Sequence, residues 1–363
     1  MAEEKWIDQA RQTREGEELD ADRLGAYLRE HIDEAEGDLE IEQFPSGFSN
    51  LTYLLSFGPL ELVLRRPPFG NRVKSAHDMG REFLVLSSIA PLYPLAPRPY
   101  LYCEDEDILG APFYVMQRHR GVVLRRQMPR GMTLSPVLAG RLCERFIDNL
   151  ATLHTLDYRA AGLGDLGRPE GYVQRQVQGW LGRYQKAQTD GWAEFDQAGA
   201  WLADNLPRFA QGEEAAAAAL IHNDYKYDNV LLAPSDLTRL VAVLDWEMCT
   251  VGHPLMDLGT TLAYWVEASD AAPLRASAFG PTWVPGSWTR QQLAERYAER
   301  TGSDLGSLLF YGVFGYYKLG VIVQQIYYRY FQGHTRDPRF AQLNQLVGLL
   351  GQVAAGALER GRL

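Results

Sequence analysis

The segment that decides how this chain folds is Leu220-Ile-His-Asn-Asp-Tyr-Lys-Tyr-Asp-Asn-Val-Leu-Leu232, followed closely by Leu240-Val-Ala-Val-Leu-Asp-Trp-Glu247. Apolar runs flank a short polar loop, a pattern that predicts two strands joined through that loop. The loop contains His222, Asp224, Lys226 and Asn229, and Asp245 ends the second apolar run. Two acids, an amide and a lysine so placed indicate a chemical site rather than a simple turn.

These residue types suit the transfer of a phosphoryl group from ATP with magnesium. A carboxylate such as Asp224 can orient a hydroxyl group and accept its proton. Asn229 and Asp245 offer the oxygen atoms that magnesium prefers. Lys226 follows Asp224 by two positions, so on an extended loop it can face the transferring phosphate. His222 is expected to brace the loop. Any one of these residues alone would be ordinary, and the combination carries the prediction.

The composition describes a globular protein. The chain has 363 residues, 46% of them hydrophobic, and its 46 acids against 36 bases give a net charge of −10. This length predicts two packed lobes, and the acidic charge argues against nucleic acid as a partner. Three scattered cysteines (Cys103, Cys143 and Cys249) argue against a disulfide framework and favour a cytoplasmic location. The start of the chain lacks an apolar signal core, and no apolar run approaches about 18 residues, so we expect no membrane span.

The first third of the chain has the pattern of a small antiparallel sheet. Residues 1–19 are polar and predict a loose arm. Asp20 is placed to cap a helix with apolar positions from Leu24 to Ile32, and Gly37 is expected to end that helix. We divide the chain into an arm and helix over 1–38, a first lobe over 39–116 and a second lobe over 117–363. Strands are expected over residues 39–44, 51–57, 60–65, 100–102 and 113–116, and a helix over residues 75–90.

The second lobe is expected to be mostly helical. Ser135 and Pro136 are a helix cap and first-turn residue, and apolar positions recur at helical spacing from there to His154. More helix is expected over residues 171–206. Beyond residue 255 the pattern predicts helices separated by loops around 270–288 and 333–338.

The polar loop and its continuation, Gly252-His-Pro-Leu-Met-Asp-Leu-Gly259, resemble the catalytic and metal-binding loops of the aminoglycoside phosphotransferase and choline kinase superfamily. The resemblance covers most of residues 40–335. It implies an α+β, bilobal protein-kinase-like fold, with a small antiparallel N-lobe that carries one main helix and a larger, mostly helical C-lobe. It also implies ATP and Mg²⁺ as cofactors, with Asp224 as catalytic base and Asn229 and Asp245 as metal ligands. Asp257 would either hold the catalytic loop from a following helix or simply cap that helix.

The same resemblance assigns residues to the nucleotide. A hairpin loop stands where kinases cover the phosphates, although it lacks the GxGxxG pattern. Arg65 stands where kinases carry a lysine, a departure that keeps the charge and changes the geometry of the contact. The residues assigned in this way are Ser46, Gly47, Ser49 and Asn50 in the loop, Arg65 with Glu82 as its ion-pair partner, and Met116 and Gln117 at the hinge whose backbone would read adenine.

A narrower resemblance concerns the acceptor. Phe48-Ser-Asn-Leu-Thr-Tyr53 and Val63-Leu-Arg-Arg-Pro-Pro68 resemble the kinase-like domain fused to some acyl-CoA dehydrogenases, and its free-standing bacterial relatives. That group implies a hydroxyacyl-CoA as the acceptor. Residues 118–130 contain five arginines and no acid, which suits an anionic acceptor. The candidate substrate residues are Arg118, Arg120, Arg125, Arg126 and Tyr317.

Three alternatives stay open. An aminoglycoside- or choline-type acceptor would suit the acidic net charge. A nucleotide-binding pseudokinase that serves as an interaction module would explain Arg65 and the missing glycine pattern. A metal-dependent hydrolase could use His222, Asp224 and His253, but it would leave Asn229 and Lys226 without a role. The expected partners are therefore a nucleotide and a small molecule with a hydroxyl group.

Overall fold

The computed structural model describes residues 4–45, 50–69, 78–335 and 337–363. The chain forms two compact units. The first unit takes in residues up to 123 together with residues 161–163 and 230–249. The second unit consists of residues 124–160, 164–229 and 250–363. Strands dominate the first unit and helices the second, so the chain is an α+β protein.

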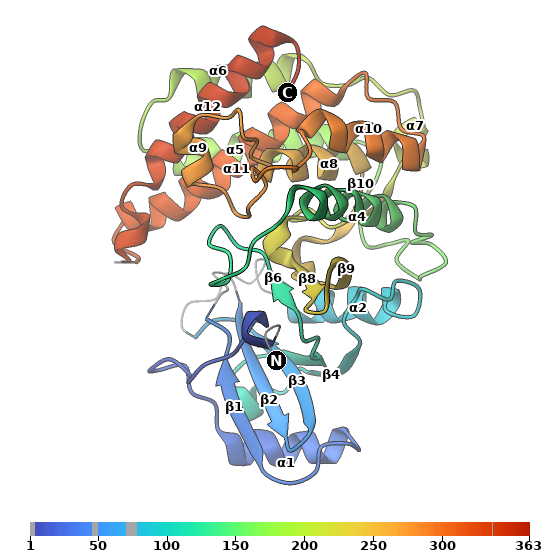
Figure 1. Ribbon diagram of the computed structural model, residues 1–363, viewed down its shortest axis with the longest axis vertical. Helices are drawn as coiled ribbons and strands as arrows, with labels where there is room; N and C mark the ends of the chain where they lie inside the picture. Colours follow the sequence, from blue (N-terminus) through green and yellow to red (C-terminus); the bar gives the residue numbers. More distant parts are fainter. Residues whose placement is uncertain (1–3, 46–49, 70–77, 336) are drawn as a thin grey trace. The chain divides into compact units, whose positions relative to one another are not determined.

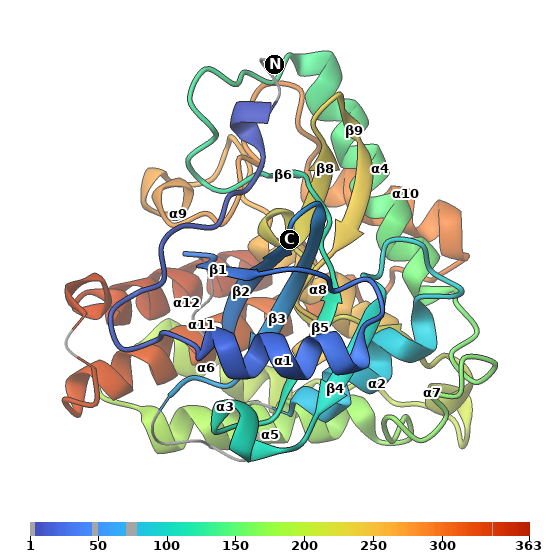
Figure 2. The ribbon, with the colours of Figure 1, turned by 90° about the horizontal axis from the view of Figure 1, so that it is seen from below.

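The first unit is built on a five-stranded antiparallel sheet with the strand order β1-β2-β3-β5-β4. Apolar residues of its central strands, among them Tyr53 and Leu64, form one core with Leu24 and Leu28 of α1 (Ala21–His31), which lies across the sheet (Figure 2). Asp20 caps α1, as predicted. The strands of this sheet are β1 (Leu39–Gln43), β2 (Leu51–Phe57), β3 (Leu60–Arg66), β4 (Pro99–Cys103) and β5 (Phe113–Gln117).

Two helices complete this part of the first unit. The main helix, α2 (Met79–Ile89), packs against β4 and β5 and begins at a cap formed by the Asp78 side chain. The segment between β4 and β5 contains one turn of helix, α3 (Glu106–Leu109), which Gly110 ends with a left-handed φ of 71°. The described strands and helices therefore follow the predicted pattern, and residues 75–77 of the predicted helix lie outside the described residues.

The prediction of a loose N-terminal arm is wrong for the described residues 4–19, which begin with the short helix η1 (Glu4–Trp6). Arg11 pairs with Gln43 as an antiparallel bridge at the free edge of β1. The Tyr53 hydroxyl donates to the backbone oxygen of Glu17 over 2.7 Å. The edge of a sheet presents backbone groups that need partners, and the arm supplies them here.

A second, three-stranded sheet belongs to the first unit. It consists of β6 (Val122–Val123), β8 (Val230–Ala233) and β9 (Asp236–Val243), in that order, and it is followed by the short helix η3 (Trp246–Met248). Gly121 lies so close to β8 that a Cβ atom there would be 2.9 Å from the Leu232 backbone oxygen. Because β6 pairs with β8, the first unit continues past the predicted lobe boundary at residue 116 and includes the hairpin β8–β9.

The second unit is a helical assembly around α11 (Leu308–Phe331), which packs against α8, α12, α5 and α6 (Figure 1). Its long first helix, α4, begins at the predicted Ser135 cap with Pro136 in its first turn. Its other described elements are α5 (Tyr172–Ala187), α6 (Ala193–Asp204), α7 (Glu213–Ala216), α8 (Pro254–Tyr264), α9 (Ala272–Ala276), α10 (Arg290–Thr301), α12 (Leu343–Arg360), β7 (Ala219–Ile221), β10 (Thr250–Gly252), η2 (Tyr227–Asn229) and η4 (Pro338–Phe340), and α4 spans Pro136–His154.

Two glycines bring α8 and α11 into direct contact. A Cβ atom on Gly315 would lie 2.2 Å from the backbone oxygen of Gly259, and one on Gly259 would lie 2.1 Å from the backbone oxygen of Tyr311. Any larger side chain at this crossing would push the two helices apart. Among the residues that the structure describes, no helix is both long and apolar enough to span a membrane.

Candidate active site

The loop of residues 222–229, which we call the catalytic loop, follows β7 and is held by the buried carboxylate of Asp257. One oxygen of Asp257 accepts the backbone N–H of His222 over 2.7 Å, and the other accepts that of Asn223 over 2.8 Å. The cap of α8 is His253, so Asp257 does not cap this helix. Asp257 lies inside α8 and anchors the start of the catalytic loop to it.

His154 of α4 completes the surroundings of Asp257. Its Nε2 atom lies 3.0 Å from the Asp257 carboxylate, and its Nδ1 atom lies 2.7 Å from the Tyr297 hydroxyl. Burial by itself would raise the pKa of Asp257, but the hydrogen bond with His154 and the nearby positive charges hold it below its usual value. The anchor of the catalytic loop is therefore an ionised carboxylate.

Asp224 has partners on both sides within the catalytic loop. The Asn229 Nδ2 atom donates to the Asp224 side chain and to its backbone oxygen, each over 2.8 Å. Lys226 forms an ion pair with the same carboxylate. Burial opposes ionisation of Asp224, yet Lys226 brings its pKa below the usual value. The His222 ring accepts the Asp224 backbone N–H over 3.3 Å, which is the bracing position that we predicted for it.

Lys226 faces two aromatic rings that the sequence did not point to. Its Nζ atom lies 5.1 Å from the ring centre of Tyr264 and 5.7 Å from that of Phe279. The two rings meet edge to face at 5.1 Å. Both rings also line a narrow apolar pocket with Leu319 and Leu346. No local pattern marks Tyr264 and Phe279, because folding alone brings them to the catalytic loop.

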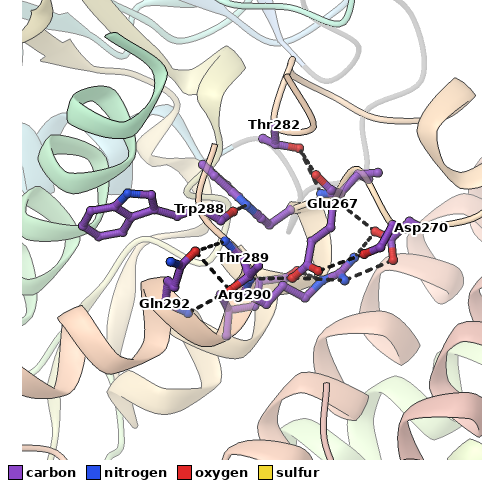
Figure 3. Close-up of polar contacts among 11 residues, drawn as sticks. Glu267, Asp270, Thr282, Trp288, Thr289, Arg290 and Gln292 are labelled. Carbon is purple, nitrogen blue, oxygen red and sulfur yellow. Dashed lines mark hydrogen bonds and ion pairs between the residues drawn. The ribbon is translucent and has the colours of Figure 1, made fainter. Parts of the chain in front are cut away.

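The segment that carries Phe279, residues 266–289, is held by a buried arginine. Figure 3 shows Arg290 beside Glu267 and Asp270: its guanidinium donates to Asp270, and its backbone N–H donates to Glu267 over 2.6 Å. The Thr282 hydroxyl connects two parts of the segment by donating to the backbone oxygen of Val266 over 2.7 Å. This segment, predicted as a loop around residues 270–288, contains the short helix α9 and is fixed by charge-assisted hydrogen bonds.

In the first unit, Arg65 lies among three carboxylates. Its Nη2 atom lies 3.0 Å from Asp245 and 3.8 Å from Glu247, and its Nε atom lies 3.4 Å from Glu82. Arg65 is buried, which by itself would lower its pKa, but these carboxylates raise the pKa well above the ordinary value. The predicted proximity of Arg65 and Glu82 is therefore present. Glu247, which also accepts from Asn50 over 2.8 Å, joins the group without having been singled out in the sequence.

Glu82 also fixes the segment that carries Asp245. Its Oε1 atom accepts the backbone N–H of Trp246 over 3.2 Å, next to Asp245, whose φ of 66° is left-handed. Burial raises the pKa of Glu82 despite Arg65. At the predicted hinge, Met116 is buried in β5, and the Gln117 backbone N–H donates to the backbone oxygen of Arg98 over 2.8 Å. Ser46, Gly47 and Ser49 lie outside the described residues.

Asn229 and Asp245, the predicted magnesium ligands, belong to different units, and each carries an oxygen donor. The amide nitrogen of Asn229 is directed at Asp224, which leaves its oxygen for a cation. Asp245 is a carboxylate at the end of β9, partly exposed. Within the described ranges there is no cluster of three His, Cys, Asp or Glu side chains arranged for a metal ion. A hard cation that keeps waters and phosphate oxygens in its shell does not need such a cluster.

Most of the arginines predicted to meet the substrate bind the chain's own groups. Arg118 donates to the backbone oxygen of Asp8, and Arg120 is paired with Glu61. Arg126 donates to the backbone oxygen of Ala276. The charge of Arg125 acts on Asp228. The ring of Tyr317 stacks on Phe195 at 4.5 Å, within the packing of α6 and α11.

With this geometry established, comparison with known proteins identifies the class. Residues 40–296 match the model of the phosphotransferase enzyme family, and the chain belongs to that family. The protein-kinase-like, bilobal α+β fold expected from the catalytic loop is confirmed, as is the resemblance to aminoglycoside phosphotransferases and choline kinases.

Two solved structures and one relative are similar to this chain. A Ralstonia eutropha protein described as a candidate aminoglycoside phosphotransferase is 28% identical, with a TM-score of 0.79 over 94% of this chain and 99% of that one. Choline kinase of Cryptosporidium parvum is 14% identical, with a TM-score of 0.66 over 94% and 97%, and shows the fold alone. Acyl-CoA dehydrogenase family member 11 of Rattus norvegicus is 33% identical over 325 residues, which are 87% of this chain. The match spans only 40% of that relative's length.

Proposed function

We propose that this protein transfers the γ-phosphoryl group of ATP to a hydroxyl group of a small molecule, with Asp224 as the catalytic base. The observation that carries the proposal is the catalytic loop itself. Asp257 anchors its backbone, and Lys226 and Asn229 hold the side chain of Asp224 in an ionised state. A held, ionised carboxylate can accept a hydrogen bond from an acceptor hydroxyl and then its proton.

The assignments on the nucleotide side follow from charge and donor type. When bound, Mg-ATP would supply the phosphoryl group and the cation that neutralises its charge. Asn229 and Asp245 would hold the cation through oxygen atoms. Arg65, kept in place by Glu82, would bind phosphate oxygens. Lys226, beside Asp224, would stabilise the negative charge on the group being transferred. The family to which the chain belongs supports this reading.

For the acceptor we favour a hydroxyacyl-CoA. The support for this acceptor is the rat relative, which is named an acyl-CoA dehydrogenase. A polycationic amino sugar or choline would instead call for carboxylates or an aromatic cage at the acceptor site. The arginine-rich loop lends less support than its sequence suggests, because three of its guanidinium groups bind the chain's own groups.

The experiment is a phosphorylation assay on the purified protein. It is incubated with Mg-ATP and, separately, with hydroxyacyl-CoAs of several chain lengths, amino sugars and choline, and products are examined by mass spectrometry for one added phosphate. We expect phosphorylation of hydroxyacyl-CoAs alone. Phosphorylation of an amino sugar or choline would overturn the acceptor, and no product with any acceptor would count against the proposed function.

Two variants then test the roles. Asp224→Asn keeps the size of the side chain but removes the base, so kcat should fall on the order of 10²–10⁴-fold while ATP binding persists. Asp245→Asn should instead weaken magnesium-dependent ATP binding. Equal loss of ATP binding in both variants would contradict the division of roles. A pseudokinase would bind Mg-ATP and show no turnover even in the wild type.

A further inference from the structure

Lys318 is a buried lysine to which the proposed chemistry assigns no role. It lies in the middle of α11 with only 2% of its surface exposed. A buried ammonium group is costly unless it is hydrogen-bonded. Burial lowers the pKa of Lys318 to about 8, and the charges of Asp257 and Asp224 partly oppose this shift. A charged side chain that is buried despite the cost in free energy is a candidate for a functional contact.

Its contacts converge on the residue that precedes the catalytic base. The Lys318 Nζ atom donates to the backbone oxygen of Asn223 over 2.8 Å and lies 3.4 Å from its side-chain oxygen. The backbone N–H of Asn223 donates to Asp257 over 2.8 Å. The N–H and the C=O of one residue are thus held by opposite charges from two different helices, α8 and α11.

The backbone of Asn223 needs such support. Its φ is 67°, in the left-handed region that residues other than glycine rarely adopt. Asparagine tolerates this region better than most residues, but the conformation still costs free energy and persists only where the surroundings enforce it. Because Asp224 is the next residue, this turn sets the direction in which the Asp224 side chain projects from the backbone.

The positions of the two charged groups are set by the helix crossing. Gly259 and Gly315 let the backbones of α8 and α11 touch. Asp257 lies two residues before Gly259, and Lys318 lies three residues after Gly315. Close contact at the glycines therefore places the carboxylate of Asp257 and the ammonium group of Lys318 at the same loop residue. A short sequence motif cannot predict this arrangement.

We propose that Lys318 is a positioning residue, which together with Asp257 clamps Asn223 in the left-handed turn that presents Asp224 to the acceptor hydroxyl. The inference rests on the proposed function, because the role of Asp224 as base belongs to it. Lys318 touches neither nucleotide nor acceptor in this scheme and acts through the backbone of Asn223.

The test compares Lys318→Met with Gln324→Met in the full-length protein. Gln324 is the matched control because it is also buried in α11 and its Nε2 atom also donates to a backbone oxygen, that of Ala187, over 2.7 Å. Lys318→Met should lower kcat on the order of 100-fold, since small displacements of a catalytic group cost that much. The KM for ATP should stay within about twofold, and Gln324→Met should keep its kcat.

Amide hydrogen exchange of residues 220–229, followed by mass spectrometry, provides a second readout that needs no acceptor. Lys318→Met should speed exchange in this segment, whereas Gln324→Met should not. Wild-type kcat together with unchanged exchange in Lys318→Met would overturn the inference and leave the proposed function standing. If the wild type itself transfers no phosphate, the proposed function fails, and the exchange result still decides whether Lys318 holds the loop. Should Lys318→Met not fold, Lys318→Gln, slightly shorter and uncharged, is expected to show the same pattern.

Discussion

The Nη2 atom of Arg65 lies 3.0 Å from the Oδ1 atom of Asp245, so the guanidinium assigned to phosphate and the carboxylate assigned to magnesium are ion-paired with each other. Glu82, almost fully buried, approaches the other side of the guanidinium at 3.4 Å. Arginine can serve two carboxylates at once because its donors form a planar fork. Arg65, which the resemblance to kinases places at the position of their lysine, is thus paired with a glutamate of α2.

Replacing Arg65 tests this pairing. Arg65→Met leaves Glu82 as an uncompensated buried charge and should lower the free energy of unfolding by about 3–5 kcal/mol, with loss of ATP turnover. Arg65→Lys keeps a point charge and should retain turnover within about tenfold. Urea unfolding and steady-state kinetics provide the measurements. The control is Arg23→Met, whose ion pair with Asp20 is exposed, and which should change stability by less than about 1 kcal/mol. Unaltered stability in Arg65→Met would refute the pairing.

Asp257→Asn tests the anchor of the catalytic loop. The variant presents an NH₂ group to backbone N–H donors and loses the charge that meets His154, so it should be less stable by about 2–4 kcal/mol. Its kcat should fall more than its KM for ATP rises, because the loop backbone moves. Asp204→Asn, at the exposed end of α6, should be neutral within about 0.5 kcal/mol. The measurements are chemical denaturation and steady-state kinetics. Equal stability and equal kinetic constants for the two variants would contradict the role of Asp257 as the anchor of the catalytic loop.

Gly315→Ala tests the helix crossing. The new Cβ atom would sit 2.2 Å from the Gly259 backbone oxygen, so α8 and α11 must separate, at a cost of about 1–3 kcal/mol or more. Gly182→Ala, in α5, is the matched control, since a Cβ atom there meets nothing within 4 Å. It should stabilise the protein by about 0.5–1 kcal/mol. Thermal unfolding of both variants gives the comparison, and similar shifts for the two would argue against close contact at Gly315.

His253 predicts how stability depends on pH. Burial, followed by the nearby His154, lowers its pKa to about 4, against about 6.5 in an unfolded chain. The unfolded state therefore binds more protons between these values, and stability falls as the pH falls from 6.5 to 4. Asparagine can also cap α8 but cannot titrate. In urea unfolding, the free energy of unfolding of the wild type minus that of His253→Asn should decrease by about 3 kcal/mol from pH 7 to pH 4. A difference that does not change with pH would contradict a neutral, buried His253.

The secondary structure was largely predictable because its signals are local. Asp20 and Ser135 cap the helices that begin beside them, and the five strands of the first sheet lie within a few residues of their predicted ranges. The N-terminal arm was misjudged because its order comes from the free edge of β1. Its residues are polar in sequence, but their backbone groups and the Tyr53 hydroxyl find partners only after folding.

The grouping of Asp224, Lys226 and Asn229 could be predicted from the sequence, because the three residues lie within one short loop and local chain geometry suffices to bring their side chains together. The residues that hold this loop and surround it come together only through folding. Lys318 lies 95 positions along the chain from Asn223, and Arg65 lies 180 from Asp245. Contacts over such separations depend on how whole helices and sheets pack, so they cannot be predicted from a local periodicity or a short motif.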